Sequence, residues 1–362
     1  MFWKLNRNNR EQDMRELSQL LSAFFSYAAA QGGTNLDEDA LLRAFPKSAP
    51  WLLEQFHGTE KNRKKLQKAI KDLFLLPVSR RQEIARAVAH DMEFDQPAGQ
   101  PLFFFAVPSL RASEQKIVKA FFLYFYDVCF HHAQGPAING HTNGATRDQF
   151  LIDYFQANDH LLQACPVCLN RKSNARKETD LEHYFPKGVY SPLILHPSNL
   201  FFICKDCNET YKGTRDALRK RGGPKPLRDV FLPYQDTVKD HTTVTFRRKA
   251  GTDHIELRSA SGDPAEQEKI NNFDYLYQLE DRWSADIEGI FKQLRTHCTG
   301  QNPEKRPKEE VRETLQRKCE ELQSLSDFPD RYVESAYLHW LCETMFDAFY
   351  DSLWDDPPCA AE

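Results

Sequence analysis

The sequence lacks any apolar run long enough to cross a bilayer, and its first ten residues lack the apolar core of a secretory leader. A membrane-spanning helix needs about 20 consecutive apolar residues. The densest apolar stretches, such as residues 102–107, are far shorter, and the first ten residues are polar and basic. We therefore expect a soluble, cytoplasmic protein that does not contact membranes.

The sequence also lacks internal repeats and long low-complexity tracts. Hydrophobic residues make up 41% and aromatic residues 12% of the 362 residues, which is enough for the cores of one large or two ordinary domains. Nine cysteines is an odd number in a chain without an export signal, so a disulfide framework is not expected. Metal ligation is the better hypothesis for these cysteines.

The chain as a whole lacks a strong excess of either charge, since its formal net charge is −4 at pH 7. Residues 160–230, however, contain thirteen Lys or Arg and seven Asp or Glu, a local charge of +6 that leaves −10 for the rest of the chain. A basic segment in an acidic chain favours a local site for a polyanion. A solvated helix face is the alternative that charge alone leaves open.

Apolar periodicity predicts helices on both sides of this basic segment. Apolar residues recur at three- and four-residue spacing in residues 14–25, 270–294 and 333–349. The last of these helices is expected to begin just after the break at residues 328–330, where Pro329 interrupts the pattern. Helical regions are therefore predicted to flank the centre of the chain.

Residues 243–257 alternate instead, which predicts a short β-hairpin. Val244 and Phe246 would face Ile255 and Leu257 across a turn that contains Gly251. Further on, the Pro- and charge-rich residues 302–310 are expected to form a surface loop.

Two Cys-x-x-Cys pairs stand in the middle of the chain. Cys165 and Cys168 form the first and Cys204 and Cys207 the second, with 35 residues between them. Each pair can present two thiolates from one tight turn, and two pairs complete the tetrahedral shell that zinc prefers. Four cysteine ligands leave no coordination position open for water, so the predicted role of the site is structural. Four ordinary buried cysteines are the alternative, and a redox role is disfavoured because neither pair follows a strand in a βαβ pattern.

The segment between and just after these pairs contains an acid–histidine pair and several polar residues at defined places. In chain order these are Glu182 and His183, then Pro197, Asn199 and Leu200, then Asn208 directly after the second cysteine pair, then Lys212 and Gly213.

This order resembles the HNH, or ββα-metal, endonuclease family with paired Cys-x-x-Cys zinc knuckles. The shared pattern is acid–His, Pro-x-Asn-Leu, Cys-x-x-Cys-Asn and Lys-Gly, over residues 165–213. Each element alone is a weak signal, but here they agree in order and spacing. Two positions depart from the family, because Glu182 stands where Asp is more usual and three residues rather than two separate Asn208 from Lys212.

The resemblance implies two antiparallel strands and a helix that grip one divalent ion. We therefore expect a mainly α chain, α+β overall, with a small zinc-braced ββα-metal module at its centre. The expected parts are a helical N-terminal region (residues 1–145), the nuclease module with its four-cysteine zinc site (residues 146–230), and a C-terminal region of a short hairpin followed by helices (residues 231–362).

The resemblance also implies roles for four residues. His183 would be the general base that takes a proton from the attacking water, because a neutral imidazole can do so near pH 7. Glu182 and Asn208 offer the hard oxygen ligands that suit a catalytic Mg²⁺ or Mn²⁺ ion. Asn199 would brace the loop so that His183 points at the water.

Further residues are expected to support this site. Asp180 is two positions before Glu182 and could share its strand face, as a spare ligand or as a partner for a nearby cation. A loop role is favoured for His196 over metal contact. Basic residues after the second cysteine pair would contact the phosphate backbone without reading its sequence. These basic residues are Lys212, Arg215, Arg219, Lys220, Arg221 and Lys225.

The implied activity is hydrolysis of phosphodiester bonds in DNA, with RNA left open. Similar layouts occur in nuclease subunits of bacterial restriction or anti-phage systems, which implies an ATPase or other protein partner for the helical flanks. Two alternatives stay open. One is a zinc-dependent nucleic-acid-binding module without catalysis, and the other is a scaffold subunit that uses the central module as a brace.

Overall fold

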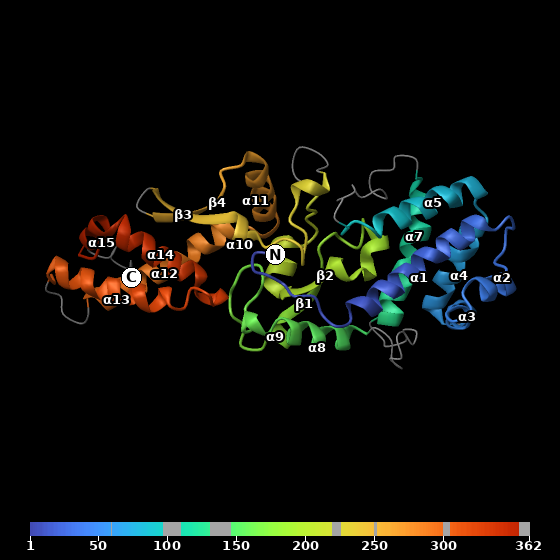
Figure 1. Ribbon diagram of the computed structural model, residues 1–362, viewed down its shortest axis with the longest axis horizontal. Helices are drawn as coiled ribbons and strands as arrows, with labels where there is room; N and C mark the ends of the chain where they lie inside the picture. The colour runs from blue at the N-terminus through green and yellow to red at the C-terminus, as the bar shows by residue number, and fades with distance from the viewer. Residues whose placement is uncertain are drawn as a thin grey trace, which may run out of the picture.

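The computed structural model describes residues 1–58, 60–96, 110–130, 146–218, 226–249, 252–299 and 305–354. These residues are mainly helical, with two small antiparallel sheets, so the expected α+β class with a majority of helix is confirmed. Figure 1 shows an elongated molecule with the first helices at one end, a two-stranded sheet in the middle and the last helices at the other end. No described helix is both long and apolar enough to span a bilayer.

The N-terminal helices pack around an aromatic core. The helix predicted over residues 14–25 is α1 (Glu11–Ala30), which packs against α5 (Val78–Asp91). Phe24 and Phe25 of α1 stack on Phe121 and Phe122, with ring centroids 5.1 and 5.7 Å apart. The other helices are α2 (Glu38–Ala44), α3 (Ala49–His57), α4 (Lys61–Phe74) and α7 (Ala112–Tyr124), which continues as the π-helical segment η1 (Phe125–Phe130).

The central part of the chain contains the first sheet. β1 (Thr179–His183) pairs antiparallel with β2 (Leu200–Cys204), which places His183 opposite Leu200. The segment η5 (Asp206–Lys212) follows, so two strands and a short helical element occur in the expected order, with π-helical geometry in the third. The remaining elements are α8 (Arg147–Ala157), α9 (Ala175–Glu178) and the 3₁₀ segments η2 (Asp159–Leu161), η3 (Ser191–Leu195), η4 (Pro197–Asn199) and η6 (Leu227–Asp229).

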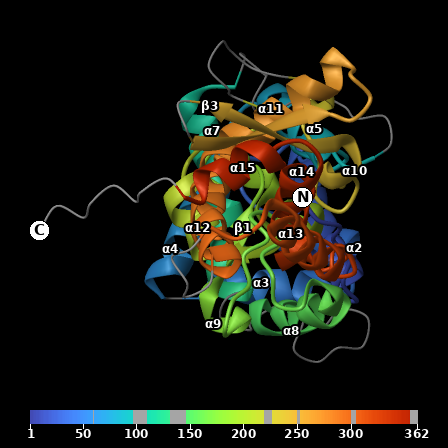
Figure 2. The same ribbon diagram turned by 90° about the vertical axis from the view of Figure 1, so that its left-hand side faces the viewer.

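The C-terminal part confirms the predicted hairpin. β3 (Thr242–Lys249) pairs with β4 (Thr252–Ser259), Val244 lies opposite Leu257 and Phe246 opposite Ile255. The turn residue Gly251 lies outside the described residues. The hairpin rests on the last helices, as both views show (Figures 1 and 2), with β4 against α12 and β3 against α14. The helices of this part are α10 (Val238–His241), α11 (Pro264–Tyr277), α12 (Leu279–Thr299), α13 (Lys308–Gln323), α14 (Tyr332–Glu343) and α15 (Phe346–Ser352).

Three predictions for the C-terminal part need correction. The single helix predicted over residues 270–294 is two helices, because Gln278 adopts a left-handed conformation (φ 52°) and ends α11. The last helix is likewise interrupted between α14 and α15. The loop predicted at residues 302–310 ends early, since Pro307 caps α13 with φ suited to a helix start and two glutamates follow in its first turn. Residues 302–304 lie outside the described residues.

The first residues of the chain contact segments that lie far along the sequence. The backbone N–H of Trp3 donates to the carbonyl of Pro166 at 2.9 Å, and that of Val238 donates to Met1 at 2.8 Å. The ring of Phe2 meets the ring of Trp283 edge-to-face at 4.8 Å. This segment therefore joins the central and C-terminal parts, across the boundaries drawn at residues 145 and 230.

Candidate metal centre and candidate active site

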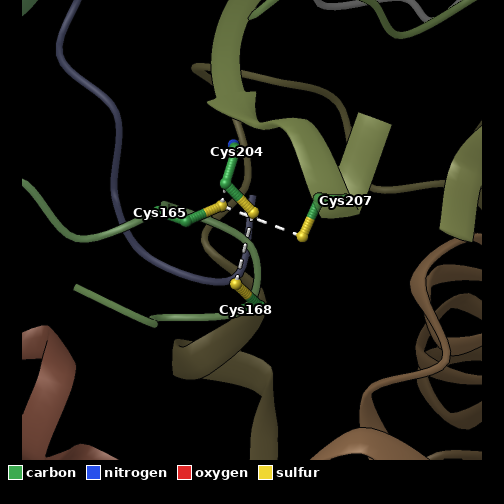
Figure 3. A group of neighbouring side chains, drawn as sticks. All are labelled: Cys165, Cys168, Cys204 and Cys207. Carbon is green, nitrogen blue, oxygen red and sulfur yellow. Dashed lines mark hydrogen bonds between the residues drawn. The ribbon is translucent and has the colours of Figure 1, made fainter. Parts of the chain in front are cut away.

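The four cysteines of the two Cys-x-x-Cys pairs form one buried cluster (Figure 3). The Sγ atoms of Cys165 and Cys207 are 3.9 Å apart, those of Cys168 and Cys204 are 3.7 Å apart, and all four lie within 4.8 Å of one another. Zinc–sulfur bonds of about 2.3 Å in a tetrahedron require sulfur–sulfur distances of about 3.8 Å. All four cysteines are free of disulfides. The cluster therefore fits a metal ion such as zinc.

Two cations lie beside this cluster. Arg282 of α12 donates from Nη1 to the Sγ of Cys207 at 3.1 Å. Burial works to lower the pKa of Arg282, but the surrounding sulfurs outweigh this effect and raise it. Burial likewise works to lower the pKa of Lys172, and Cys204 and Asp206 raise it. Zinc with four thiolates carries a net charge of −2, which these two cations would offset.

The C-terminal helices are anchored at the same place. Trp283 is buried, and its indole N–H donates to the carbonyl of Cys168 at 3.0 Å. Arg282 also lies over the ring of Tyr211, with its guanidinium carbon 3.9 Å from the ring centroid. Neither residue could be predicted as part of the site, because an Arg-Trp pair on an amphipathic helix carries no local sign of cysteines far away in the chain.

His183 ends β1 and is almost fully buried, with 6% of its surface exposed. Its Nε2 lies 3.0 Å from the carbonyl oxygen of Ile194. Since a carbonyl can only accept, Nε2 carries the proton, and in the neutral imidazole the lone pair is on Nδ1. The ring of Tyr126 packs against the imidazole, with centroids 5.0 Å apart.

Asn199 ties together the two ends of the chain segment that connects β1 to β2. Its side-chain oxygen accepts from the backbone N–H of Phe185 at 2.7 Å, and its amide donates to the carbonyls of Phe185 (3.2 Å) and Leu193 (3.0 Å). Asn199 is fully buried. Because Phe185 follows His183 by two residues, these bonds fix the backbone directly after the histidine.

Asp180 and Glu182 both face η5. The amide of Asn208 donates to Asp180 at 3.4 Å, and the ammonium of Lys212 forms a buried ion pair with Glu182 and also donates to the carbonyl of His183 at 3.0 Å. Burial raises the pKa of Glu182, and Lys212 opposes that rise. The side chains of Glu182 and His183 thus leave β1 in different directions, as consecutive residues of a strand do.

Of the basic residues predicted to follow nucleic acid, the structure describes Lys212 and Arg215, and both contact other parts of the protein. Lys212 is 1% exposed and engaged with Glu182, so it does not lie on the surface where a phosphate backbone would run. Arg215 is half-buried and donates to the carbonyl of Tyr275 at 2.8 Å, which makes it a contact to α11. Arg219, Lys220, Arg221 and Lys225 lie outside the described residues.

His196 belongs to a buried polar cluster with the N-terminal helices. Its Nδ1 accepts from the backbone N–H of Ser198 at 3.3 Å, and Arg15 and Asp95 lie beside its Nε2 at 3.3 and 3.9 Å. Burial lowers the pKa of His196 to about 4, because the charged form is disfavoured there. Arg15 also donates to Asp95 at 2.7 Å, and the hydroxyl of Ser198 donates to the same carboxylate. The predicted loop role of His196 agrees with these contacts, which fasten its loop to α1.

Apart from the four cysteines, no three ligand atoms of His, Cys, Asp or Glu gather within the described residues. The oxygens of Glu182 and Asn208, with Asp180 as the spare ligand, are those predicted to hold a catalytic Mg²⁺ or Mn²⁺ ion, and they fit such an ion in chemical type. One of them, the carboxylate of Glu182, is paired with Lys212.

Comparison with known proteins adds no assignment. No family model, curated protein or solved structure matches this chain.

Proposed function

We propose that this protein is a metal-dependent endonuclease of the HNH type that hydrolyses phosphodiester bonds in DNA. The observation that carries the proposal is the arrangement of His183 and Asn199 at one end of the β1–β2 pair, whose other end carries Cys204 of the four-cysteine cluster. A histidine held by one backbone carbonyl, with its following backbone fixed by a buried asparagine, is suited to proton transfer.

In this proposal His183 accepts the proton of the attacking water at Nδ1. The hydrogen bond from Nε2 to Ile194 supports the imidazolium that results, since the carbonyl oxygen stabilises the positive ring. Asn199 fixes the backbone of the segment that connects β1 to β2 by its hydrogen bonds to Phe185 and Leu193, and so holds the orientation of the imidazole. The nucleophile is water, and the phosphodiester oxygen that leaves is the 3′ oxygen.

A divalent ion would be held by Glu182 and Asn208, with Asp180 as a third oxygen donor. When bound, such an ion supplies charge neutralisation at the scissile phosphate. The four-cysteine zinc site has a different task, which is to hold η5 and its Asn208 beside β1.

The buried Lys212–Glu182 ion pair supports a second candidate, a nucleic-acid-binding or scaffold subunit without catalysis. An ammonium on Glu182 neutralises the acid that the divalent ion would need. In that case the four cysteines would brace a binding module only.

Incubation with supercoiled plasmid distinguishes the two candidates. The nuclease proposal predicts conversion to nicked or linear plasmid with Mg²⁺ or Mn²⁺, and no conversion in a chelator that leaves the buried zinc in place. Plasmid that is bound but left intact at every divalent-ion concentration would support the second candidate. The proposed setting, a cytoplasmic bacterial defence system with an ATPase partner for the helical flanks, rests on the family resemblance alone.

A further inference from the structure

Tyr126 brings the N-terminal helices into contact with His183. It is 4% exposed, and its ring meets the imidazole edge-to-face, with centroids 5.0 Å apart and an angle of 63° between the rings. The two residues come from separate parts of the chain, since Tyr126 follows α7 and His183 ends β1.

The backbone around Tyr126 has an unusual geometry. η1 is π-helical over its six residues, and π-helical turns are rare and occur mostly where a site needs the changed side-chain direction. Within this turn Phe125 packs inside the N-terminal helices, 5.5 Å from Trp51 and 5.0 Å from Phe121. Its neighbour Tyr126 reaches the central sheet instead.

The ring of Tyr126 is itself held in place. The ammonium of Lys187 lies 4.9 Å from its centroid, and the ring of Phe130 stacks on it at 5.7 Å. Lys187 follows β1 by four residues, so the phenol ring contacts both His183 at the end of β1 and Lys187 in the segment after it. A ring held in this way can transmit its orientation to the imidazole.

We propose that Tyr126 is a positioning residue that fixes the plane of the His183 imidazole. The hydrogen bond to Ile194 fixes the position of Nε2 but leaves the imidazole of His183 free to rotate about that bond. Contact with the ring of Tyr126 fixes the plane of the imidazole. The inference rests on the proposed role of His183 as general base. Burial raises the pKa of Tyr126, so the phenol stays neutral.

Three variants test this role with cleavage at saturating divalent ion. Tyr126→Leu should lower the cleavage rate by roughly ten- to a hundredfold at unchanged substrate affinity and zinc content, because small displacements of a reacting group cost this much. Tyr126→Phe keeps the ring and should retain most of the rate. Phe125→Leu removes an equally buried ring from the same turn, away from His183, and should lower the melting temperature without this loss of rate. If Tyr126→Leu does not fold, Tyr126→Met replaces it.

The imidazole resonances of His183 provide a measurement that does not depend on cleavage. In ¹⁵N-histidine-labelled protein these resonances should shift in Tyr126→Leu and stay close to wild type in Tyr126→Phe. If no protein cleaves nucleic acid, the proposed function fails, and the spectra still decide whether Tyr126 positions His183. Unchanged resonances together with an unchanged rate in Tyr126→Leu or Tyr126→Met would overturn the inference.

Discussion

At the scale of single residues, the least expected contact is the ion pair between Lys212 and Glu182. The Lys212 side chain is 1% exposed and the Glu182 side chain 9%. Removing one partner of a buried pair leaves an uncompensated charge, which typically costs about 3–5 kcal/mol. The pair therefore holds η5 against β1 and at the same time occupies the acid proposed to bind a divalent ion.

Lys212→Met tests both roles of this pair. The variant should unfold at lower urea concentration than wild type, because the Glu182 carboxylate loses its buried partner. If Glu182 is a ligand, Mg²⁺ or Mn²⁺ should restore part of the lost stability, since the ion replaces the ammonium. Equilibrium unfolding with and without the ion measures the effect. Lys292→Met removes an exposed pair with Glu288 and serves as the control, with little change in stability expected.

At the scale of elements, the 3₁₀ segment η4 couples the N-terminal helices to the proposed active site. His196 and Ser198 contact Arg15 and Asp95, and the next residue, Asn199, braces the backbone after His183. A movement of α1 would therefore be transmitted to His183, the proposed base, through these contacts of His196, Ser198 and Asn199.

His196 gives this element a defined pH dependence. The pKa of its imidazole falls from 6.5 to about 4 on folding, because burial disfavours the charged form. The unfolded chain then binds more protons between these values, so stability is complete above about pH 6.5 and is lost as the pH falls toward 4. Between pH 7 and 5 the expected loss is about 2 kcal/mol.

Urea unfolding of wild type and His196→Gln at pH 7, 6 and 5 measures this contribution. The free energy of unfolding of the variant should depend less steeply on pH than that of wild type, whatever its value at pH 7. Equal slopes for the two proteins would contradict the assignment. Asp95 does not interfere, since its pKa is lowered from 3.8 and it titrates below this window.

Sequence patterns predicted elements best where one local rule decides the outcome. Alternation gave the register of β3 and β4, and the doubled Cys-x-x-Cys spacing found the four cysteines that cluster. The break at Gln278 could not be predicted, because a glutamine in a left-handed conformation is imposed by its surroundings and carries no turn signature. The burial of Lys212 could not be predicted for a similar reason. A lysine near a cysteine pair is typical of a surface cation, and only the folded structure brings it to its partner Glu182 on β1.

At the scale of the whole molecule, the four-cysteine cluster lies where three parts of the chain meet. Its cysteines come from the central part, Arg282 and Trp283 come from α12, and the first residues of the chain contact both Pro166 and Trp283. A metal ion there would fix the arrangement of these three parts, which no local sequence pattern indicates.

Elemental analysis should find one zinc ion per chain, and Cys204→Ser should lose it. Because the four cysteines come together only when the central part of the chain is folded, metal binding stabilises that fold. The variant should therefore lose the central fold and the docking of α12 together. Limited proteolysis should then cut between the central and C-terminal parts, with Cys298→Ser, a buried cysteine away from the cluster, as the control. Correctly folded protein that contains no zinc would contradict the assignment.

The most direct test of the central claim is cleavage of supercoiled plasmid by His183→Ala at saturating Mg²⁺ or Mn²⁺, with zinc content and DNA affinity measured on the same preparation. A general base contributes about 10²–10⁴-fold to rate, so the account predicts a loss of that size with zinc and affinity unchanged, and partial recovery on addition of imidazole. A well-folded His183→Ala protein that cuts at the wild-type rate would contradict it.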